Sequence, residues 1–333
     1  MGSVNRTNVK NAWSENIATS VFIVSSFLGK LACRRGWETG NLPTIGLDLT
    51  QFHGLFDADP VGMITAARVA DEHGIGEVHV GDHVAISRGA VENRAAYPWP
   101  YEYPWFEPLT ALSAIAAQTQ RVRLVTSVLI APLRPAVFLA KQAATLDVIS
   151  GGRAELGLGI GWQAEEFAAS GIPFTGRRRL IEEQIAACRE LWTNAPASFD
   201  GRRVRFRDLY SLPLPPQGPG LPILLGGGPT ETNFRLIAHL ASGWLAQAVP
   251  PGEFALSTRT LRETWDRAGR STPCKITLKM ALPTVESVAD QIALARDYFA
   301  AGADTVVVRA PPTCRTASDL VPFIDKVATL STT

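Results

Sequence analysis

The chain has 333 residues, 46% of them hydrophobic, and its 32 basic and 31 acidic side chains give a net charge of +1. This balance argues against a nucleic-acid-binding protein, because neutralising phosphates needs an excess of basic residues. It also argues against a disordered chain, since this much apolar surface can be buried to offset the loss of chain entropy. The four cysteines, Cys33, Cys188, Cys274 and Cys314, are not closely paired. Their spacing predicts neither a disulfide framework nor a zinc site, and it favours a cytoplasmic protein.

Residues 1–42 differ in composition from the rest of the chain. The apolar stretch from Ala18 to Leu28 precedes Arg34 and Arg35, whereas a secretory signal peptide carries its basic residues before the apolar region. The stretch is also much shorter than the ~20 residues that span a bilayer, so we expect no membrane segment. We predict that residues 1–42 are either a disordered extension or the result of a start codon assigned too far upstream, and that residues 43–333 form one domain.

From Thr44 onward, short apolar runs alternate with segments of helical periodicity. Val137, Ala140, Ala144 and Val148, for example, follow the 3.6-residue repeat of a helix. Strands that are apolar on both faces and joined by helices indicate a parallel sheet covered by helices, which is an α/β fold. Eight such strands predict a single (β/α)8 TIM barrel, with insertions after strands 2 and 4 and an active site at the carboxyl ends of the strands. The predicted strands are Thr44–Thr50, Glu77–Val80, Arg123–Val128, Ala154–Leu158, Pro222–Leu225, Gly243–Ala246, Lys275–Leu282 and Asp304–Arg309.

Asp82 and His83 follow the second predicted strand, and a long loop over residues 84–106 begins there. An imidazole at this end of a strand can move a proton near neutral pH, although a purely structural histidine also fits the sequence. The loop contains Trp99, Tyr103 and Trp105 among several prolines. Because the loop is long and apolar, we expect a lid or a wall of a ligand site, with a plain connecting loop as the alternative.

Glycines follow the fourth predicted strand. Gly159 and Gly161 precede Trp162, and such glycines let the backbone approach a bound group closely. The stretch also matches a weak form of the dinucleotide-binding fingerprint. The acidic residues about twenty positions later, Glu182 and Glu183, lie in a predicted helix, whereas the fingerprint requires one at the end of the next strand. This argues against a Rossmann fold.

Gly227, Gly228 and Thr230 follow the fifth predicted strand and lead into a helix. Backbone N–H groups at a helix N-terminus, together with a hydroxyl, can bind a phosphate. The alternative is a glycine turn in which Thr230 only caps the helix. Neither a P-loop nor a GxSxG motif is present in the sequence, and no cluster of histidines and carboxylates predicts a metal site.

Taken in order, these motifs resemble the luciferase-like monooxygenase superfamily. The resemblance covers the chain from about Gly46 to the C-terminus and is densest between Glu107 and Trp162. It is specific because many separate motifs occur in the same order, and it is nearest to the branch assigned to the 5-deazaflavin coenzyme F-420. The motifs are Asp82-His83, Trp105-Phe106-Glu107-Pro108-Leu109, Thr126-Ser127-Val128-Leu129, Leu133-Arg134, Ala140-Lys141, Ala144-Thr145-Leu146-Asp147, Ser150-Gly151-Gly152-Arg153, Gly157-Leu158-Gly159-Ile160-Gly161-Trp162 and Pro222-Ile223-Leu224-Leu225-Gly226-Gly227-Gly228.

The resemblance implies a bacterial-luciferase-like barrel that holds a flavin or a deazaflavin at its mouth. It implies a bulge with a non-prolyl cis peptide at Ser127-Val128, which would support the central ring of the cofactor. The glycine turn and Thr230 after the fifth strand would hold the cofactor phosphate, and the segment from Gly159 to Trp162 would border the cofactor.

The resemblance also places His83 near the cofactor ring as proton donor, base or substrate contact, with Asp82 beside it. The aromatic residues of the 84–106 loop would then cover the substrate. Trp162 stands where sugar-phosphate dehydrogenases of the superfamily have a catalytic glutamate, which argues against that activity. Barrels of this type often dimerise, so a homodimer is one expectation.

We predict an oxidoreductase that uses coenzyme F-420 for hydride transfer to or from a small, fairly apolar organic substrate held under the 84–106 loop. The alternatives are an FMN-dependent monooxygenase, in which reduced flavin reacts with oxygen, and a non-catalytic flavin-binding barrel. Only six of the 32 basic residues are lysines. This bias is typical of high-GC bacteria, many of which make the deazaflavin, and it favours F-420. Neither a nucleic acid nor a membrane is an expected partner.

Overall fold

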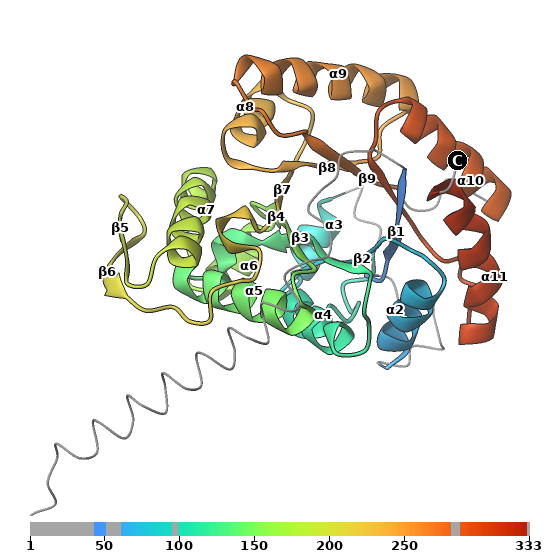
Figure 1. Cartoon of the computed structure of the whole chain (residues 1–333), viewed down its shortest axis with the longest axis horizontal. Helices are drawn as coiled ribbons and strands as arrows, with labels where there is room; N and C mark the ends of the chain where they lie inside the picture. Colours follow the sequence, from blue (N-terminus) through green and yellow to red (C-terminus); the bar gives the residue numbers. More distant parts are fainter. Residues whose placement is uncertain (1–42, 51–60, 95–98, 281–286, 332–333) are drawn as a thin grey trace, which may run out of the picture. The chain divides into compact units, whose positions relative to one another are not determined.

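The computed structural model describes residues 43–50, 61–94, 99–280 and 287–331, and the predicted extension over residues 1–42 lies outside the described residues. Eight parallel strands close into a barrel in the order in which they occur along the chain (Figure 1). The predicted barrel is thus confirmed, and each strand agrees with its predicted range to within a few residues. The barrel strands are β1 (Thr44–Asp48), β2 (Glu77–Val80), β3 (Arg123–Ile130), β4 (Ala154–Gly159), β7 (Ile223–Gly226), β8 (Gly243–Gln247), β9 (Lys275–Lys279) and β10 (Thr305–Val308).

Helices surround the barrel and connect each strand to the next (Figure 1). Their apolar faces pack against the outer face of the strands in one continuous hydrophobic core. No helix in the described ranges is long and apolar enough to cross a membrane. The flanking helices are α2 (Gly62–Glu72), α4 (Pro108–Ala116), α5 (Ala136–Ser150), α7 (Arg177–Thr193), α8 (Glu231–Leu240), α9 (Pro251–Arg267), α10 (Val288–Ala300) and α11 (Ala317–Ala328), and the short 3-10 turns are η3 (Ala131–Leu133), η4 (Gly218–Gly220) and η5 (Thr329–Ser331).

The two predicted insertions follow β2 and β4. The first carries the short helix α3 (Arg88–Glu92), and the second carries α6 (Ala164–Ala169) and, after α7, an antiparallel hairpin of β5 (Ala197–Asp200) and β6 (Arg205–Leu209). This hairpin lies outside the barrel and was not predicted. Its strands are short and most of their residues are exposed or half-buried, so no run of apolar residues marks them in the sequence.

A network of buried charges closes the amino-terminal end of the barrel interior. Lys275 Nζ lies 2.7 Å from Glu77 Oε1 and 2.7 Å from Glu155 Oε1. Arg123 Nε lies 3.1 Å from Glu155 Oε2. Burial is the largest single effect and disfavours the ionised carboxylate, but Lys275 and His79 together outweigh it and hold the pKa of Glu77 well below its usual range. Two cations therefore face two carboxylates, and this end of the barrel is balanced in charge.

The third strand is irregular near the opposite end of the barrel. Its pairing with β4 shifts register after Thr126, and the Ser127–Val128 peptide bond is cis. Both features were implied by the resemblance and are confirmed. The side chain of Val128 occupies space that a Cβ would need at two glycines: an ideal Cβ on Gly159 would lie 2.6 Å from Val128 Cγ2, and one on Gly226 would lie 2.9 Å from Val128 Cγ1. The glycines that end β4 and β7 are therefore required for the packing of the bulge.

A substitution in β4 tests this close approach of strands. A Cβ on Gly157 would collide with the backbone carbonyl oxygen of Thr126 in β3, which the barrel holds in place. We expect Gly157→Ala to lower the free energy of unfolding by about 2–3 kcal/mol, measured by urea denaturation. Gly252→Ala in α9 is the matched control, since a Cβ there meets no atom within 4 Å. The control should be as stable as the parent chain or slightly more stable, because alanine favours a helix over glycine. A Gly157→Ala variant of parental stability would contradict the packing described here.

Candidate active site

Asp82 follows β2 and is buried by the segment that follows β3. Its Oδ2 accepts hydrogen bonds from Arg134 Nη1 at 2.6 Å and from the backbone N–H of Ile130 at 2.9 Å, and its Oδ1 accepts one from Arg134 Nη2 at 3.2 Å. Arg134 Nη2 also donates to Glu107 Oε1 at 2.9 Å. Both oxygens of this predicted catalytic residue are therefore engaged, and Asp82 ties the loop after β2 to the end of β3.

His83 pairs with a buried carboxylate that was not predicted. Its Nδ1 lies 3.1 Å from Glu166 Oε2. Glu166 belongs to α6, and its Oε1 accepts the backbone N–H groups of Val84 at 2.6 Å and Ala85 at 3.3 Å. Burial disfavours the charged carboxylate, but the hydrogen bonds from His83 and from the backbone N–H groups of Val84 and Ala85 together outweigh burial and keep the pKa of Glu166 below its usual value. The carboxylate thus fixes the Nδ1 side of the imidazole.

The sequence holds one signal for this carboxylate. Glu165 and Glu166 lie in the first turn of the helix that follows the β4 glycines, where acidic residues are favoured by the helix dipole. Glu165 is exposed and Glu166 is buried, but six residues are too few for a helical repeat to show which one faces the barrel.

The second ring nitrogen of His83 has a different partner. Trp162 Nε1 donates to His83 Nε2 across 3.4 Å. A neutral imidazole that carries its proton on Nδ1 satisfies both contacts, because Nδ1 then donates to Glu166 and Nε2 accepts from Trp162. The guanidinium of Arg94 stacks over Trp162, 4.4 Å from the ring centroid. In the His83–Glu166 pair, His83 Nε2 is therefore the atom that can accept a proton.

The three aromatic residues predicted to form a lid or wall lie together beside His83. The ring centroid of Trp105 is 4.7 Å from that of His83 and 5.5 Å from that of Tyr103, and Trp99 is 4.8 Å from Tyr103. The Tyr103 hydroxyl donates to the backbone carbonyl of Thr50 at 2.6 Å, which attaches the loop to the end of β1. These residues form one wall, called the aromatic wall below. Residues 95–98 of the loop lie outside the described residues.

The bulge of β3 and the glycines after β4 border the same mouth of the barrel. Ser127 is only 6% exposed, and its Oγ has no hydrogen-bond partner among the described residues. A buried hydroxyl in a folded protein is normally satisfied, so this one is available to a bound group. Gly161 has a φ of 73°, and a Cβ there would lie 2.7 Å from the ring of Phe167. The glycine is therefore required both for this backbone conformation and for packing.

A cavity of about 210 Å³ opens between the carboxyl ends of β4 and β7. Gly159 and all three predicted phosphate-binding residues, Gly227, Gly228 and Thr230, line this cavity. The Thr230 hydroxyl accepts the backbone N–H of Asn233 at 3.3 Å and so caps α8. A side chain at Gly228 would meet no atom within 4 Å. The turn therefore caps α8 through Thr230, and it also borders an open cavity, which a phosphate site requires.

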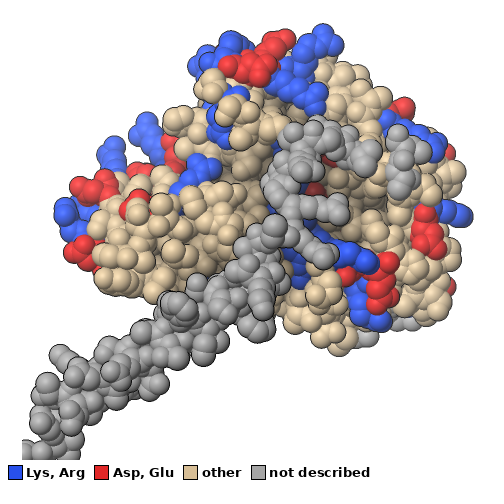
Figure 2. All heavy atoms as spheres, in the orientation of Figure 1, with Lys and Arg blue, Asp and Glu red and all other residues tan. Residues whose placement is uncertain are grey.

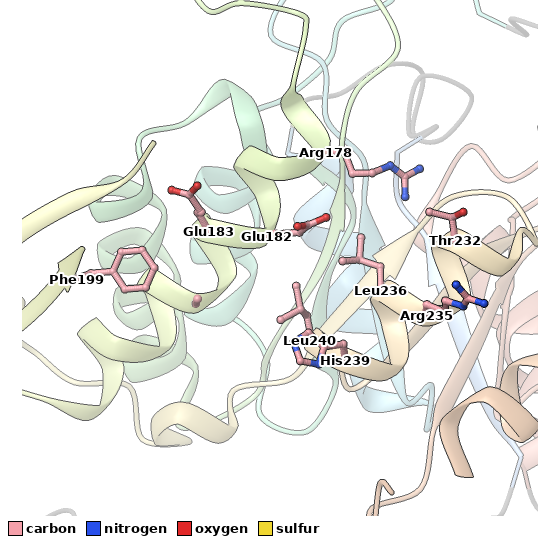
Figure 3. Close-up of a pocket in the computed structure, with 10 residues that line it drawn as sticks. Arg178, Glu182, Glu183, Phe199, Thr232, Arg235, Leu236, His239 and Leu240 are labelled. Atoms are coloured by element: carbon pink, nitrogen blue, oxygen red, sulfur yellow. The ribbon is translucent and has the colours of Figure 1, made fainter. Parts of the chain in front are cut away.

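Arg178, in the first turn of α7, also lines this cavity and was not predicted to do so. The run of arginines over residues 177–179 is typical of an exposed helix face, and Arg178 is indeed exposed. Positive charge at a helix N-terminus is unfavourable, however, and a nearby anion would offset it. Arg178 also lines a more open groove of about 430 Å³ between α7 and α8 (Figure 3). Phe199 of β5 lines the end of this groove that is far from Arg178.

Charged side chains of both signs are mixed on the surface of the protein (Figure 2). Figure 2 shows basic and acidic side chains interspersed on the visible face, with uncharged residues between them. Within the described residues, no group of three or more His, Cys, Asp and Glu side chains could hold a metal ion.

A closed parallel barrel whose mouth carries a histidine–carboxylate pair, a cis-peptide bulge and a glycine-lined cavity defines the class of (β/α)8-barrel enzymes. The sequence profile of the luciferase-like monooxygenases matches residues 49–324, and the chain belongs to this family. The family predicted from the sequence motifs is thereby confirmed.

The curated relatives differ in how much of the chain they match. An uncharacterised protein of Mycobacterium tuberculosis (strain ATCC 25618 / H37Rv) is 33% identical over 273 residues, which cover 79% of this chain and 91% of that protein. The FMNH2-dependent dimethylsulfone monooxygenase of Pseudomonas putida is 36% identical over 141 residues, which cover 41% of this chain and 38% of that enzyme.

Solved structures share the fold at low sequence identity. An F-420-dependent secondary alcohol dehydrogenase in complex with an F-420–acetone adduct has a TM-score of 0.70 at 15% identity, covering 87% of this chain and 99% of that one. The monooxygenase RslO1 from Streptomyces bottropensis has a TM-score of 0.64 at 21% identity, covering 86% and 98%. The proteins that resemble this chain in fold or in sequence thus include an oxidoreductase named for F-420 and a monooxygenase named for FMNH2.

The ionised Glu166 should make the stability of the fold depend on pH. Because its pKa is lower in the folded than in the unfolded chain, its contribution is present at neutral pH and is lost as the pH falls through the folded value, below the usual carboxyl range. In urea titrations from about pH 7 to about pH 3, we expect the free energy of unfolding to fall, and to fall less steeply in Glu166→Gln. The exposed neighbour provides a control, since Glu165→Gln should follow the parent curve. Parallel curves for all three proteins would contradict the prediction.

Proposed function

We propose that the protein is an oxidoreductase that uses the deazaflavin coenzyme F-420 for hydride transfer to or from a small organic substrate. The proposal rests on the His83–Glu166 pair. Hydride transfer to a carbonyl, or from an alcohol, also requires a proton to be given to or taken from the substrate oxygen. His83 Nε2 is suited to this step when the substrate oxygen replaces its 3.4 Å contact with Trp162, because Glu166 already holds Nδ1. The shared fold of the F-420-dependent secondary alcohol dehydrogenase supports the same choice of chemistry.

The residues at the mouth fit a phosphorylated flavin or deazaflavin. We assign the cofactor phosphate to Gly227, Gly228 and Thr230, which border an open cavity beside the N-terminus of α8. We assign the ring to the bulge of β3, where the buried Ser127 hydroxyl lacks a partner among the described residues, and the segment from Gly159 to Trp162 borders it. When bound there, F-420 supplies the hydride donor or acceptor.

The remaining residues orient the substrate and move the proton. Glu166 keeps the imidazole proton on Nδ1 and stabilises the positive charge that forms when His83 Nε2 takes up a second proton. Trp162 orients the imidazole through its contact with Nε2. Asp82 is a positioning residue, because its ion pair with Arg134 holds the loop that carries His83. The aromatic wall covers the substrate and excludes water from it.

An FMN-dependent monooxygenase is the second candidate. The observation that favours it is the 36% identity, over 141 residues, to the FMNH2-dependent dimethylsulfone monooxygenase of Pseudomonas putida. The same cavity would serve, since FMN also carries a phosphate. The two candidates differ in the co-reactant: reduced FMN reacts with oxygen, whereas a deazaflavin exchanges hydride with an organic substrate.

Cofactor titration separates these candidates. The purified full-length protein is titrated with F-420 and with FMN, and binding is followed by cofactor fluorescence. We expect micromolar affinity for F-420 and weaker affinity for FMN. Tighter binding of FMN, with oxygen consumption when the flavin is reduced, would replace the proposal by the second candidate. Micromolar binding of neither cofactor would overturn both.

Substitution of His83 tests the catalytic role. We expect His83→Ala to slow hydride transfer between F-420 and a small alcohol or ketone by about 10²–10⁴-fold, because the proton then has no acceptor or donor. The affinity of this variant for the cofactor should stay within about threefold of the parent value, since the residues assigned above to the cofactor do not include His83. Glu166→Gln should slow the same step less, as the histidine remains. A protein that binds cofactor but shows equal, background-level rates in the parent and His83→Ala would be a non-catalytic binding protein.

A further inference from the structure

Two cations share one carboxylate at the mouth of the barrel. Lys279 Nζ lies 3.2 Å from Asp48 Oδ1, and Arg309 Nε lies 2.9 Å from Asp48 Oδ2. Asp48 ends β1, Lys279 ends β9, and Arg309 follows the last residue of β10. All three therefore lie at the carboxyl ends of their strands, where barrel enzymes bind their substrates. None of them has a role in the function proposed so far.

The charge network at the other end of the barrel provides a direct comparison. Lys275 and Lys279 are four residues apart on β9, so their side chains leave the same face of the strand, ~13 Å apart. Lys275 and Arg123 face two carboxylates, and none of the buried side-chain nitrogen and oxygen atoms of these four residues lacks a hydrogen-bond partner in the described chain. At the mouth, Asp48 is the one carboxylate that the described residues bring to Lys279 and Arg309, and Arg309 Nη1 is buried without a hydrogen-bond partner among them.

The excess positive charge is held in a poorly hydrated place. The side chains of Lys279 and Arg309 are each 15% exposed, and that of Asp48 is fully buried. Burial lowers the pKa of Lys279, Asp48 opposes this effect, and the neighbouring Arg309 adds to it, so that the pKa lies below its usual value. A second anion beside these cations would offset both the burial and the repulsion.

The cluster lies away from the cavity assigned to the cofactor phosphate, and Lys279 Nζ lies 3.3 Å from the backbone carbonyl oxygen of Ser127, in the bulge assigned to the cofactor ring. Around the closed barrel, β10 stands opposite β4, and β1 stands opposite β7, whereas the phosphate cavity lies between β4 and β7. The Arg309 guanidinium lies 5.5 Å from the ring centroid of Trp99 in the aromatic wall. Lys279 Nζ lies 3.4 Å from the hydroxyl of Thr50, the residue whose carbonyl accepts the Tyr103 hydroxyl. The two cations are thus next to the wall that covers the substrate.

We infer that Lys279 and Arg309 bind an oxyanion of the substrate, either a carboxylate or a phosphate ester, and that Asp48 keeps the two cations in place. Arg309 offers planar donors that match the geometry of such groups, and Lys279 adds a point charge. The inference rests on the proposed function for the position of the substrate. It also changes the expected substrate from a fairly apolar molecule to one with an anionic end.

Benzoate and benzamide form a matched pair of probes, because they share the ring that would contact the aromatic wall and differ in charge. In calorimetric titrations of the full-length protein without cofactor, we expect benzoate to bind at least about tenfold more tightly than benzamide. Phenyl phosphate and benzyl alcohol repeat the comparison and show which oxyanion is preferred. Arg309→Gln and Lys279→Met should each reduce the preference for the anion to below about threefold.

Substitution of Asp48 should have the opposite effect on the preference for the anionic probe. Asp48→Asn removes the carboxylate that competes for the two cations, so the preference for benzoate should rise by about threefold or more. A cluster that only stabilised the fold would not produce this gain. Lys275→Met is the matched control on the same strand: it should lower stability but leave the preference unchanged. Arg178→Ala should also leave it unchanged, which excludes binding in the phosphate cavity.

The inference is overturned if the parent protein shows no preference for the anionic probes, or if the preference survives in both Arg309→Gln and Lys279→Met. Should one of these variants fail to fold, the other decides, since each removes one of the two cations. These titrations involve no cofactor. A protein that bound neither F-420 nor FMN would therefore overturn the proposed function while leaving the result at Lys279 and Arg309 intact.

Discussion

The close approach of β3, β4 and β7 is the constraint on which the mouth of the barrel depends. Val128 fills the space that side chains would need at Gly159 and Gly226, so the bulge of β3 can form only between glycines. The bulge in turn carries the Ser127 hydroxyl, which has no hydrogen-bond partner in the described part of the chain, and the end of β7 leads directly into the turn at Gly227. One packing contact therefore shapes both the surface assigned to the cofactor ring and the cavity assigned to its phosphate.

Buried carboxylates orient the loops around this centre. Asp82 holds the segment after β3 through Arg134, and Glu166 holds the loop after β2 through His83. Buried ion pairs add little net stability, because desolvation offsets much of the attraction, but removing one partner is costly. Their main effect here is to fix positions. Asp48 differs from these two carboxylates because it meets two cations, and that local imbalance is hidden by a net charge of only +1 for the whole chain.

The barrel itself could be predicted almost completely, because its signals are local. The barrel strands are short, largely apolar segments that are mostly buried, and they alternate with segments of helical periodicity along the chain. The hairpin of β5 and β6 could not be predicted in this way, since it lies outside the barrel and its exposed residues follow no apolar pattern. The family motifs extended the prediction to the cis peptide at Ser127–Val128, a feature that no periodicity would have indicated.

The sequence alone determined the fold, the family and the place of His83 and the glycine turn, because each of these follows from neighbouring residues or from motifs in order. Only the tertiary structure decided the partners. Glu166 lies 83 positions from His83 in the chain, and its contact with the imidazole exists only because β2 and β4 end at the same mouth. Lys275 and Lys279 look alike on one strand. Among the residues that the structure describes, two carboxylates pair with Lys275, whereas Lys279 shares a single carboxylate with Arg309.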